Sequence, residues 1–248
     1  MSTVRSAVAL LTRFPVATAT TDTPGAAAFG LVGAGLGLVG AIPFALLAGP
    51  AGEPWIAAVA AIATMAIVTG AIHLDGLGDT ADAVMARDAD AAERARKDPH
   101  LGTGGVVAIL LLVAADVVAL VSLAPQGAIR GGLVLVAVAS ASRVVPILVT
   151  IVLGSLRPAP ATTLGAWFAD RVTLTDAVVA LVSVVIVAVA LVPIGGLIVP
   201  IAVLATLIAG CAAGAIVVAL RGGLDGDGMG ALIELSVMAG LIAAAIVS

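Results

Sequence analysis

Seven long apolar stretches follow one another along the chain, and the short segments between them hold most of the charged residues. These stretches, each of about 20 mainly apolar residues, occur at 26–49, 54–73, 104–124, 130–153, 174–193, 197–220 and 229–248. A helix needs about 20 apolar residues to cross the hydrocarbon core of a bilayer. The pattern therefore predicts an all-α, polytopic integral membrane helix bundle of about seven transmembrane helices, with residues 1–248 forming a single integral membrane domain.

The N-terminal segment departs from this pattern. Arg5 and Arg13 bracket an apolar stretch of only seven residues, which is too short to span a bilayer. It also lacks the longer apolar region and the small-residue cleavage site of a signal peptide. We expect residues 1–20 to form an interfacial or re-entrant segment.

The basic residues predict the orientation of the chain. Nine of the eleven Lys and Arg residues lie in the N-terminal segment or in the connections 74–103, 154–173 and 221–228. Seven spans place these four regions on one side, and Lys and Arg favour the cytoplasmic side of a membrane. We therefore expect a protein of the cytoplasmic (inner) membrane with a cytoplasmic N-terminus and a cytoplasmic loop at 74–103. Of the other two, Arg130 lies at the opposite rim of the membrane and Arg143 lies well inside a predicted span.

Composition supports membrane lipid as the surroundings of this chain. Apolar residues make up 62% of it and charged residues 10%, with a mean hydropathy of +1.26, whereas soluble domains are about a quarter charged. The net charge of −4 excludes the basic footprint that nucleic-acid binding requires. Gly30, Gly33 and Gly37 in the first span predict close helix packing, and such faces of small residues also favour self-association into a homo-oligomer.

An acidic cluster follows the second span. On a helix, Asp75, Asp79 and Asp82 would share one face about one turn apart, where like charges repel. A bound cation reverses this penalty, and Mg²⁺ or Mn²⁺ prefers carboxylate and phosphate oxygens. Gly76 and Gly78 would let a ligand approach closely. We predict a divalent metal site here, and we interpret Asp88, Asp90 and Glu93 as a solvated acidic surface.

Two further polar patches lie near the predicted cytoplasmic ends of spans. Arg96 and Lys97 precede a glycine-rich turn whose free N–H groups would suit phosphate. Asp227 follows a second glycine-rich stretch, and Glu234 lies about one turn inside the last span. A charged group inside the membrane is costly without a partner, so Glu234 and Arg143 are candidate functional residues. His73 is a candidate phosphate donor or carboxylate orienter, because two histidines among carboxylates make a poor zinc site.

At these residues the chain resembles the cobalamin synthase family, whose members are also called adenosylcobinamide-GDP ribazoletransferases. The resemblance covers nearly the whole length, and the stretch from His73 to Asp82 is its most specific part. The other matching stretches are Leu11 to Val16, Lys97 to Gly102, Ser142 with Arg143, Gly226 with Asp227, and Gly230, Ala231 and Glu234. Ala83 stands where the family mostly has glycine. Asp225 stands where Thr or Asn is common, which adds a negative charge near the expected phosphate site.

The resemblance implies a transferase that joins α-ribazole, or its 5′-phosphate, to adenosylcobinamide-GDP and releases GMP. Metal bound by aspartates would neutralise the charge that develops on the phosphoryl oxygens. The expected metal ligands are Asp75, Asp79 and Asp82. Either Asp227 or Glu234 would complete the site or accept the hydroxyl proton. The expected substrate-binding residues are Arg13, His73, Arg96, Lys97 and Arg143.

Three other functions remain open on sequence alone. A CDP-alcohol phosphotransferase acting on lipid also uses spaced aspartates at a membrane surface, but its longer Asp-Gly-x-x-Ala-Arg pattern is missing here. A polyprenyl-diphosphate transferase would need a second aspartate-rich motif, of which 221–228 is a poor version. An ion-coupled transporter would use Asp116, Arg143 and Glu234 as a midplane site, although the densest acids lie outside the spans.

Overall fold

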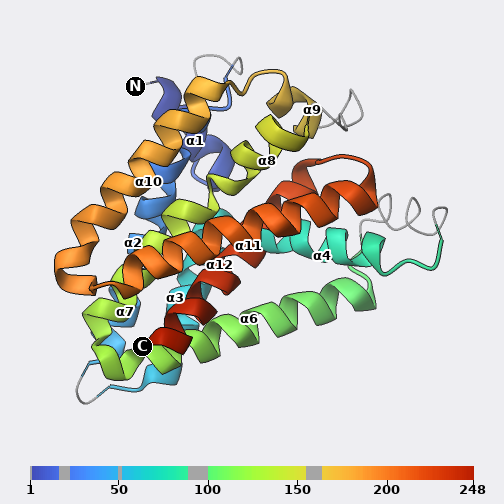
Figure 1. The fold of residues 1–248 in the computed structure, drawn as a ribbon. Helices are drawn as coiled ribbons and strands as arrows, with labels where there is room; N and C mark the ends of the chain where they lie inside the picture. The colour runs from blue at the N-terminus through green and yellow to red at the C-terminus, as the bar shows by residue number, and fades with distance from the viewer. Residues whose placement is uncertain (1, 17–22, 50–51, 89–99, 155–163) are drawn as a thin grey trace.

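The computed structural model describes residues 2–16, 23–49, 52–88, 100–154 and 164–248, and these ranges contain helices and connections without a strand (Figure 1). The helices are α1 (Ser2–Leu11), α2 (Phe29–Leu47), α3 (Pro54–Thr69), α4 (Ile72–Val84), α6 (Thr103–Leu123), α7 (Ala128–Ser142), α8 (Val145–Leu153), α9 (Leu164–Ala169), α10 (Leu174–Gly195), α11 (Ile198–Arg221) and α12 (Gly226–Val247). Two short 3₁₀ helices, Ala26–Ala28 and Ala124–Gln126, precede α2 and follow α6.

The membrane-spanning helices agree closely with the predicted apolar stretches. Six helices in the described ranges are long and apolar enough to cross a membrane, and a bent pair formed by α3 and α4 raises this number to seven. The predicted all-α, multi-pass membrane bundle is therefore confirmed. The second stretch differs from a simple span, because α3 has 16 residues and thus extends only about 24 Å, less than the hydrocarbon thickness.

A sharp bend separates α3 from α4. The two helix axes differ by 91°, and the turn uses left-handed backbone at both Gly70 (φ 64°) and Ala71 (φ 57°). Glycine adopts this conformation freely, whereas alanine pays a steric cost. The predicted connection 74–103 consequently begins inside a helix, and the aspartates at its start lie on α4.

The helix pair α7–α8 forms the centre of the bundle. It continues from Ala128 to Leu153 as the most buried of the candidate spans, and α2, α10, α11 and α12 all contact it. Helical hydrogen bonding is interrupted after Ser142, because Pro146 has no N–H to donate to the carbonyl four residues earlier. Arg143 and Val144 form the resulting break, so Arg143 lies at an irregular point inside the protein.

The N-terminal segment is a short helix that packs on the bundle. Helix α1 has ten residues and would extend only about 15 Å, so it does not cross the membrane by itself. Ala7 and Leu11 are buried in the main core, whereas Val4 is exposed. The expectation that the first residues do not form a span agrees with this length.

Close packing of α2 on α7 depends on glycine, as the sequence predicted. A Cβ atom added at Gly37 would lie 2.6 Å from the Cα of Val136, and one added at Gly33 would collide with the carbonyl oxygen of Ala139. Gly30 similarly faces Ser183 on α10. These glycines let the helix backbones approach directly, which is how helices associate where lipid removes the hydrophobic drive.

We predict that Gly37→Ala lowers the thermal unfolding midpoint of the protein in lipid nanodiscs. The added methyl would force α2 away from backbone atoms of α7, and overpacking of this kind costs about 1–3 kcal/mol. Gly35→Ala is the matched control, because nothing lies within 4 Å of its added Cβ. The control should unfold at the same or a higher temperature, and equal midpoints for the two variants would contradict the packing argument.

Candidate active site

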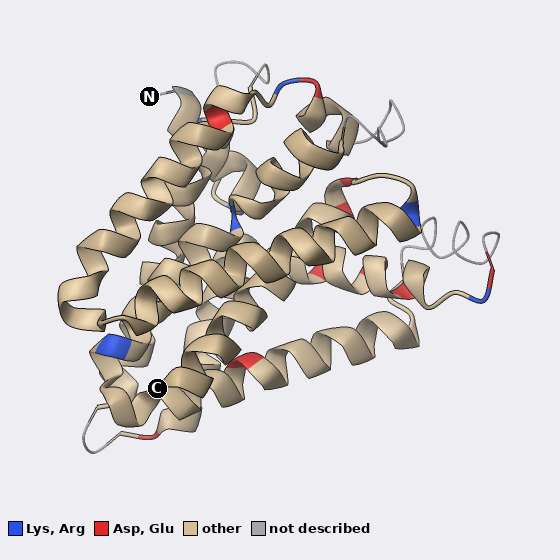
Figure 2. Cartoon of the chain, viewed as in Figure 1, with Lys and Arg blue, Asp and Glu red and all other residues tan. Residues whose placement is uncertain are grey.

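The candidate site forms where α4 crosses the first turn of α12. A Cβ atom at Gly76 would lie 2.7 Å from the carbonyl oxygen of Asp227, and one at Gly230 would lie 3.1 Å from the Cα of His73. The two helices therefore touch backbone to backbone. In Figure 2, the acidic residues of α4 lie close to those at the start of α12.

The negative charges of three other carboxylates act on Asp79. Asp79 lies in α4, outside the six spanning helices, and its pKa is raised chiefly by burial. The negative charges of Asp227, Asp75 and Asp82 raise the pKa of Asp79 further, in that order. Arg221 acts in the opposite direction. Asp79 is thus the residue at which the carboxylates converge, and a cation at this point would relieve their repulsion.

Asp82 has a structural role that the sequence did not reveal. Its two carboxylate oxygens accept hydrogen bonds from the backbone N–H groups of Gly102 (2.6 Å) and Gly105 (2.9 Å). These groups belong to the start of α6, where free N–H groups and the helix dipole favour negative charge. The glycine-rich turn predicted to bind phosphate therefore has two of its N–H groups bound to Asp82.

Arg221 joins three elements beside the site. Its guanidinium donates to the Thr80 hydroxyl on α4 (2.7 Å) and to Asp225 before α12 (2.7 Å). The other Asp225 oxygen accepts from the N–H of Gly228 and so caps α12. Asp225, whose charge stood out against the family pattern, is thus neutralised by a basic residue four positions earlier.

A cavity of about 530 Å³ opens beside the crossing of α4 and α12. Its polar wall contains His73, Asp75, Asp225 and Asp227. Its apolar wall combines side chains of α1, α9 and α12 with three residues near the starts of α2, α4 and α8. These lining residues are Leu10, Leu11, Phe29, Ile72, Pro146, Leu164, Phe168, Met229 and Ile233. Cavities of this size and mixed lining are typical of small-molecule sites.

Metal binding fits the charge of this site but not a closed protein cage. Among the described residues, no three His, Cys, Asp or Glu side chains are arranged to hold an ion. Mg²⁺ commonly takes one or two carboxylates and completes its shell with water and substrate phosphate. Asp75 and Asp227, which line the same cavity, provide two such hard oxygen donors.

The predicted site residues divide into several groups. Asp75, Asp227 and His73 line the large cavity, while Asp79 and Asp82 continue along the same face of α4. Arg13 is exposed, and its side chain occupies the space left by the missing Cβ of Gly70 at the α3–α4 bend. Arg96 and Lys97 lie outside the described residues.

Arg143 and Glu234 occupy a different place from the other candidates. Neither lines the large cavity; both border a small internal one together with Asp116. Glu234 nevertheless approaches the site, since its Oε1 lies 3.8 Å from Nδ1 of His73. His73 therefore separates Glu234 from the large cavity.

Sequence reasoning did not assign Arg221, Thr80 or the apolar wall from α9 to the site. Arg221 ends α11 and Asp225 caps α12 across a short turn, so helical spacing did not indicate their pairing. The contribution of Phe168 and Leu164 to the cavity wall could not be predicted from the sequence. It depends on the packing of α9 against the segment before α12, where Gly165 lies against Leu224 and Asp225.

Fold and site together define a multi-pass membrane protein with an acidic, partly apolar cavity. The family model for cobalamin-5-phosphate synthase matches residues 3–245, and the chain therefore belongs to this family. An adenosylcobinamide-GDP ribazoletransferase of Shigella dysenteriae is 31% identical over 216 residues, which cover 87% of this chain and 85% of the relative.

Other relatives carry the same name. The adenosylcobinamide-GDP ribazoletransferase of Escherichia coli O139:H28 is also 31% identical, again over 87% of this chain and 85% of its own length. That of Thiobacillus denitrificans is 42% identical over 89 residues, covering 35% of this chain and 36% of the relative. No solved structure matches the chain. The relatives are transferases, so family membership favours an enzyme over the ion-coupled transporter.

We predict that Asp82→Asn destabilises the protein. Asparagine keeps one carbonyl acceptor but loses the second acceptor and the charge at the start of α6, and such a loss costs about 1 kcal/mol. The unfolding midpoint in nanodiscs should fall accordingly. Asp88→Asn, at an exposed position, is the control for the change of side chain. An unchanged midpoint for Asp82→Asn would show that these hydrogen bonds do not support α6.

Proposed function

We propose that the protein is an adenosylcobinamide-GDP ribazoletransferase, which joins α-ribazole or its 5′-phosphate to adenosylcobinamide-GDP. The observation that carries this proposal is the cavity of about 530 Å³ that combines Asp75 and Asp227 with an apolar wall. Its acidic side suits a metal-bound diphosphate, and its apolar side suits the flat ring system of a nucleoside base. The names of the full-length relatives support the same reaction.

The reaction requires one bond to form and one to break. A ribose hydroxyl oxygen of α-ribazole attacks the phosphorus that bears the cobinamide group, and the bond from that phosphorus to the GMP oxygen breaks. The hydroxyl proton passes to a base, and GMP leaves with the bonding electrons. Catalysis of phosphoryl transfer consists mainly of positioning the partners and stabilising charge on the phosphoryl oxygens.

Asp75, Asp79 and Asp227 are the carboxylates that we propose to hold Mg²⁺, with Mn²⁺ as a substitute. Bound metal would supply positive charge to the diphosphate oxygens and orient the leaving group. Asp82 was expected to be a ligand as well, and its lone pairs beyond the two hydrogen bonds to α6 leave that role open. In its present geometry Asp82 holds the start of α6 against α4.

Residues around the large cavity would bind and orient the substrates. His73 lines the cavity, and we propose that its ring binds substrate there. Asp227 lines the same cavity, and its carboxylate oxygen that does not bind metal is our candidate for accepting the hydroxyl proton. We propose that Arg13, Arg96 and Lys97 contribute positive charge to the guanosine diphosphate. We propose that Arg143 and Glu234 act through His73 instead of touching substrate.

We further propose that the site faces the cytoplasm from the cytoplasmic membrane. The basic residues Arg5, Arg13, Arg87, Arg171 and Arg221 lie in the predicted cytoplasmic segments, and the large cavity is lined by residues that adjoin these segments. Lys and Arg resist translocation. Soluble substrates would then reach the cavity without crossing the bilayer.

The decisive assay uses purified protein in nanodiscs with adenosylcobinamide-GDP, α-ribazole and Mg²⁺. We expect a corrinoid product and GMP in equal amounts, and we expect chelation of Mg²⁺ to stop both. Folded protein that gives no turnover in lipid would contradict the proposed function. A product formed from lipid and a CDP-alcohol would favour the alternative lipid enzyme.

We predict that Asp79→Asn or Asp79→Ala lowers kcat/KM by about 100-fold or more, because the site loses charge that positions the metal against the diphosphate. The Mg²⁺ concentration needed for half-maximal activity should rise in the same variants. Asp88→Asn removes a carboxylate from an exposed position and should leave both quantities unchanged. Normal Mg²⁺-dependent GMP release by Asp79→Ala would remove the basis for the proposed metal site.

A further inference from the structure

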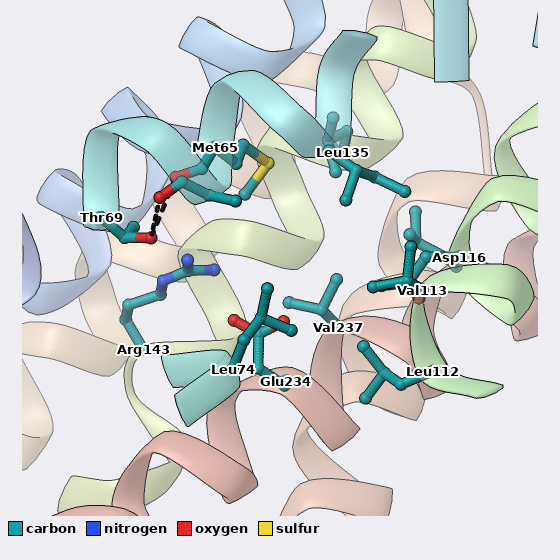
Figure 3. A pocket seen from close by; sticks show the side chains of 13 residues that line it. Met65, Thr69, Leu74, Leu112, Val113, Asp116, Leu135, Arg143, Glu234 and Val237 are labelled. Atoms are coloured by element: carbon teal, nitrogen blue, oxygen red, sulfur yellow. Dashed lines mark hydrogen bonds between the residues drawn. The ribbon is translucent and has the colours of Figure 1, made fainter. Parts of the chain in front are cut away.

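A second, much smaller cavity lies inside the bundle, apart from the large one. Its volume is about 30 Å³, and its polar lining consists of Thr69, Asp116, Arg143 and Glu234. These residues come from α3, α6, the α7–α8 break and α12. Figure 3 shows the guanidinium of Arg143 and the carboxylate of Glu234 projecting into the same space between apolar side chains. No bond-making or bond-breaking step of the proposed reaction takes place in this cavity.

Two polar side chains of this cavity each have one buried atom without a hydrogen-bond partner in the protein. Arg143 is 1% exposed and Asp116 is 3% exposed, yet Nε of Arg143 and Oδ1 of Asp116 have no hydrogen bond. Arg143 does donate from Nη1 to the Ser142 hydroxyl (3.0 Å) and to the Ala139 carbonyl (3.5 Å). Buried polar atoms are almost always satisfied by protein or by ordered water. An unsatisfied charged group inside a membrane protein is especially costly.

The cavity has room for the missing partner. A bound water needs a polar site with about 10–15 Å³ of space and two to four hydrogen-bonding neighbours. The cavity exceeds that volume, and Arg143, Asp116 and Glu234 provide donors and acceptors on several sides. Apolar cavities of this size stay dry, whereas polar ones bind water.

Glu234 connects this cavity to the substrate cavity. Its Oε1 lies 3.8 Å from Nδ1 of His73, and that nitrogen is buried without a hydrogen bond. The separation is too long for a direct hydrogen bond, and a polar contact of this length commonly holds a water between its partners. The His73 ring also lines the large cavity, so one imidazole borders both spaces.

We infer that the small cavity binds one or two waters that link Asp116, Arg143 and Glu234, and that this hydrated network holds the His73 ring in one orientation and tautomer. Glu234 would accept from Nδ1–H of His73 through water, which leaves Nε2 without a proton and able to accept a hydrogen bond from a substrate hydroxyl group. The state of one imidazole nitrogen is set by the partner of the other. Arg143 and Glu234 are then positioning residues, and the consequence for catalysis rests on the proposed function.

The histidines provide a direct readout. The chain contains two of them, His73 and His100, so ¹⁵N-histidine labelling gives signals that His100→Gln assigns. We expect His73 in the wild-type protein to show a single Nδ1–H tautomer. In Glu234→Gln the amide keeps the shape of the side chain, and we expect a mixed or Nε2–H signal. Identical His73 signals in both proteins would overturn the inference, and this readout needs no turnover.

Filling the cavity tests the water itself. Val113 borders the small cavity, so Val113→Leu adds a methylene group where the water would lie. We expect the His73 signal to change and kcat to fall about tenfold, with the KM for adenosylcobinamide-GDP changed less than twofold. Val118→Leu, on the outer face of the same helix (52% exposed), should match the wild type. Wild-type kcat and His73 signal in Val113→Leu would contradict a role for the water.

A high-resolution structure of the protein in lipid is the third test of the inferred water. Density for water in contact with Nε of Arg143 and Oδ1 of Asp116 is expected, and an empty cavity at a resolution that shows other internal waters would overturn the inference. If Val113→Leu unfolds, Glu234→Gln and the wild-type density decide the matter. A protein without turnover whose His73 signal still depends on Glu234 would separate failure of the proposed function from failure of the network.

Discussion

The backbone contact between α4 and α12 is the constraint on which the rest of the site depends. Gly76 and Gly230 have no side chain at the crossing, so the first turn of α12 lies directly against the aspartate face of α4. This contact adds the charge of Asp227 to an already repulsive group. The packing of α12 against α4, α6, α7, α8 and α11 offsets the electrostatic repulsion at Asp79.

The acids of this region then separate into two kinds. Asp82 and Asp225 are satisfied by the protein, the first by backbone N–H groups of α6 and the second by Arg221 and Gly228. Both hold helix ends in place. Asp75 and Asp227 line the large cavity together with Asp225, and Asp79 follows Asp75 one turn later on α4. Capping thus fixes the framework, while the carboxylates along the cavity wall give the site its negative charge.

Local patterns predicted most of the fold, because the length of an apolar stretch decides by itself whether a helix can span a bilayer. The bend at Gly70 and Ala71 was not predictable in this way. Alanine seldom adopts positive φ, and the turn is supported by a distant segment through the Arg13 N–H, which donates to the Val68 carbonyl. Similarly, the aspartate spacing pointed to the site, but no spacing relates His73 to Glu234.

The helix break at Gly70 and Ala71 and the one at Arg143 and Val144 adjoin the two cavities. Thr69 at the end of α3 borders the small cavity and Ile72 at the start of α4 borders the large one; Arg143 and Pro146 at the α7–α8 break do the same. Lipid cannot satisfy backbone groups released by a break, so irregular backbone must lie inside the protein. The same enclosed places are the only ones where charged side chains can be hydrated or paired at that depth. Broken helices and polar chemistry therefore occur together here for one physical reason.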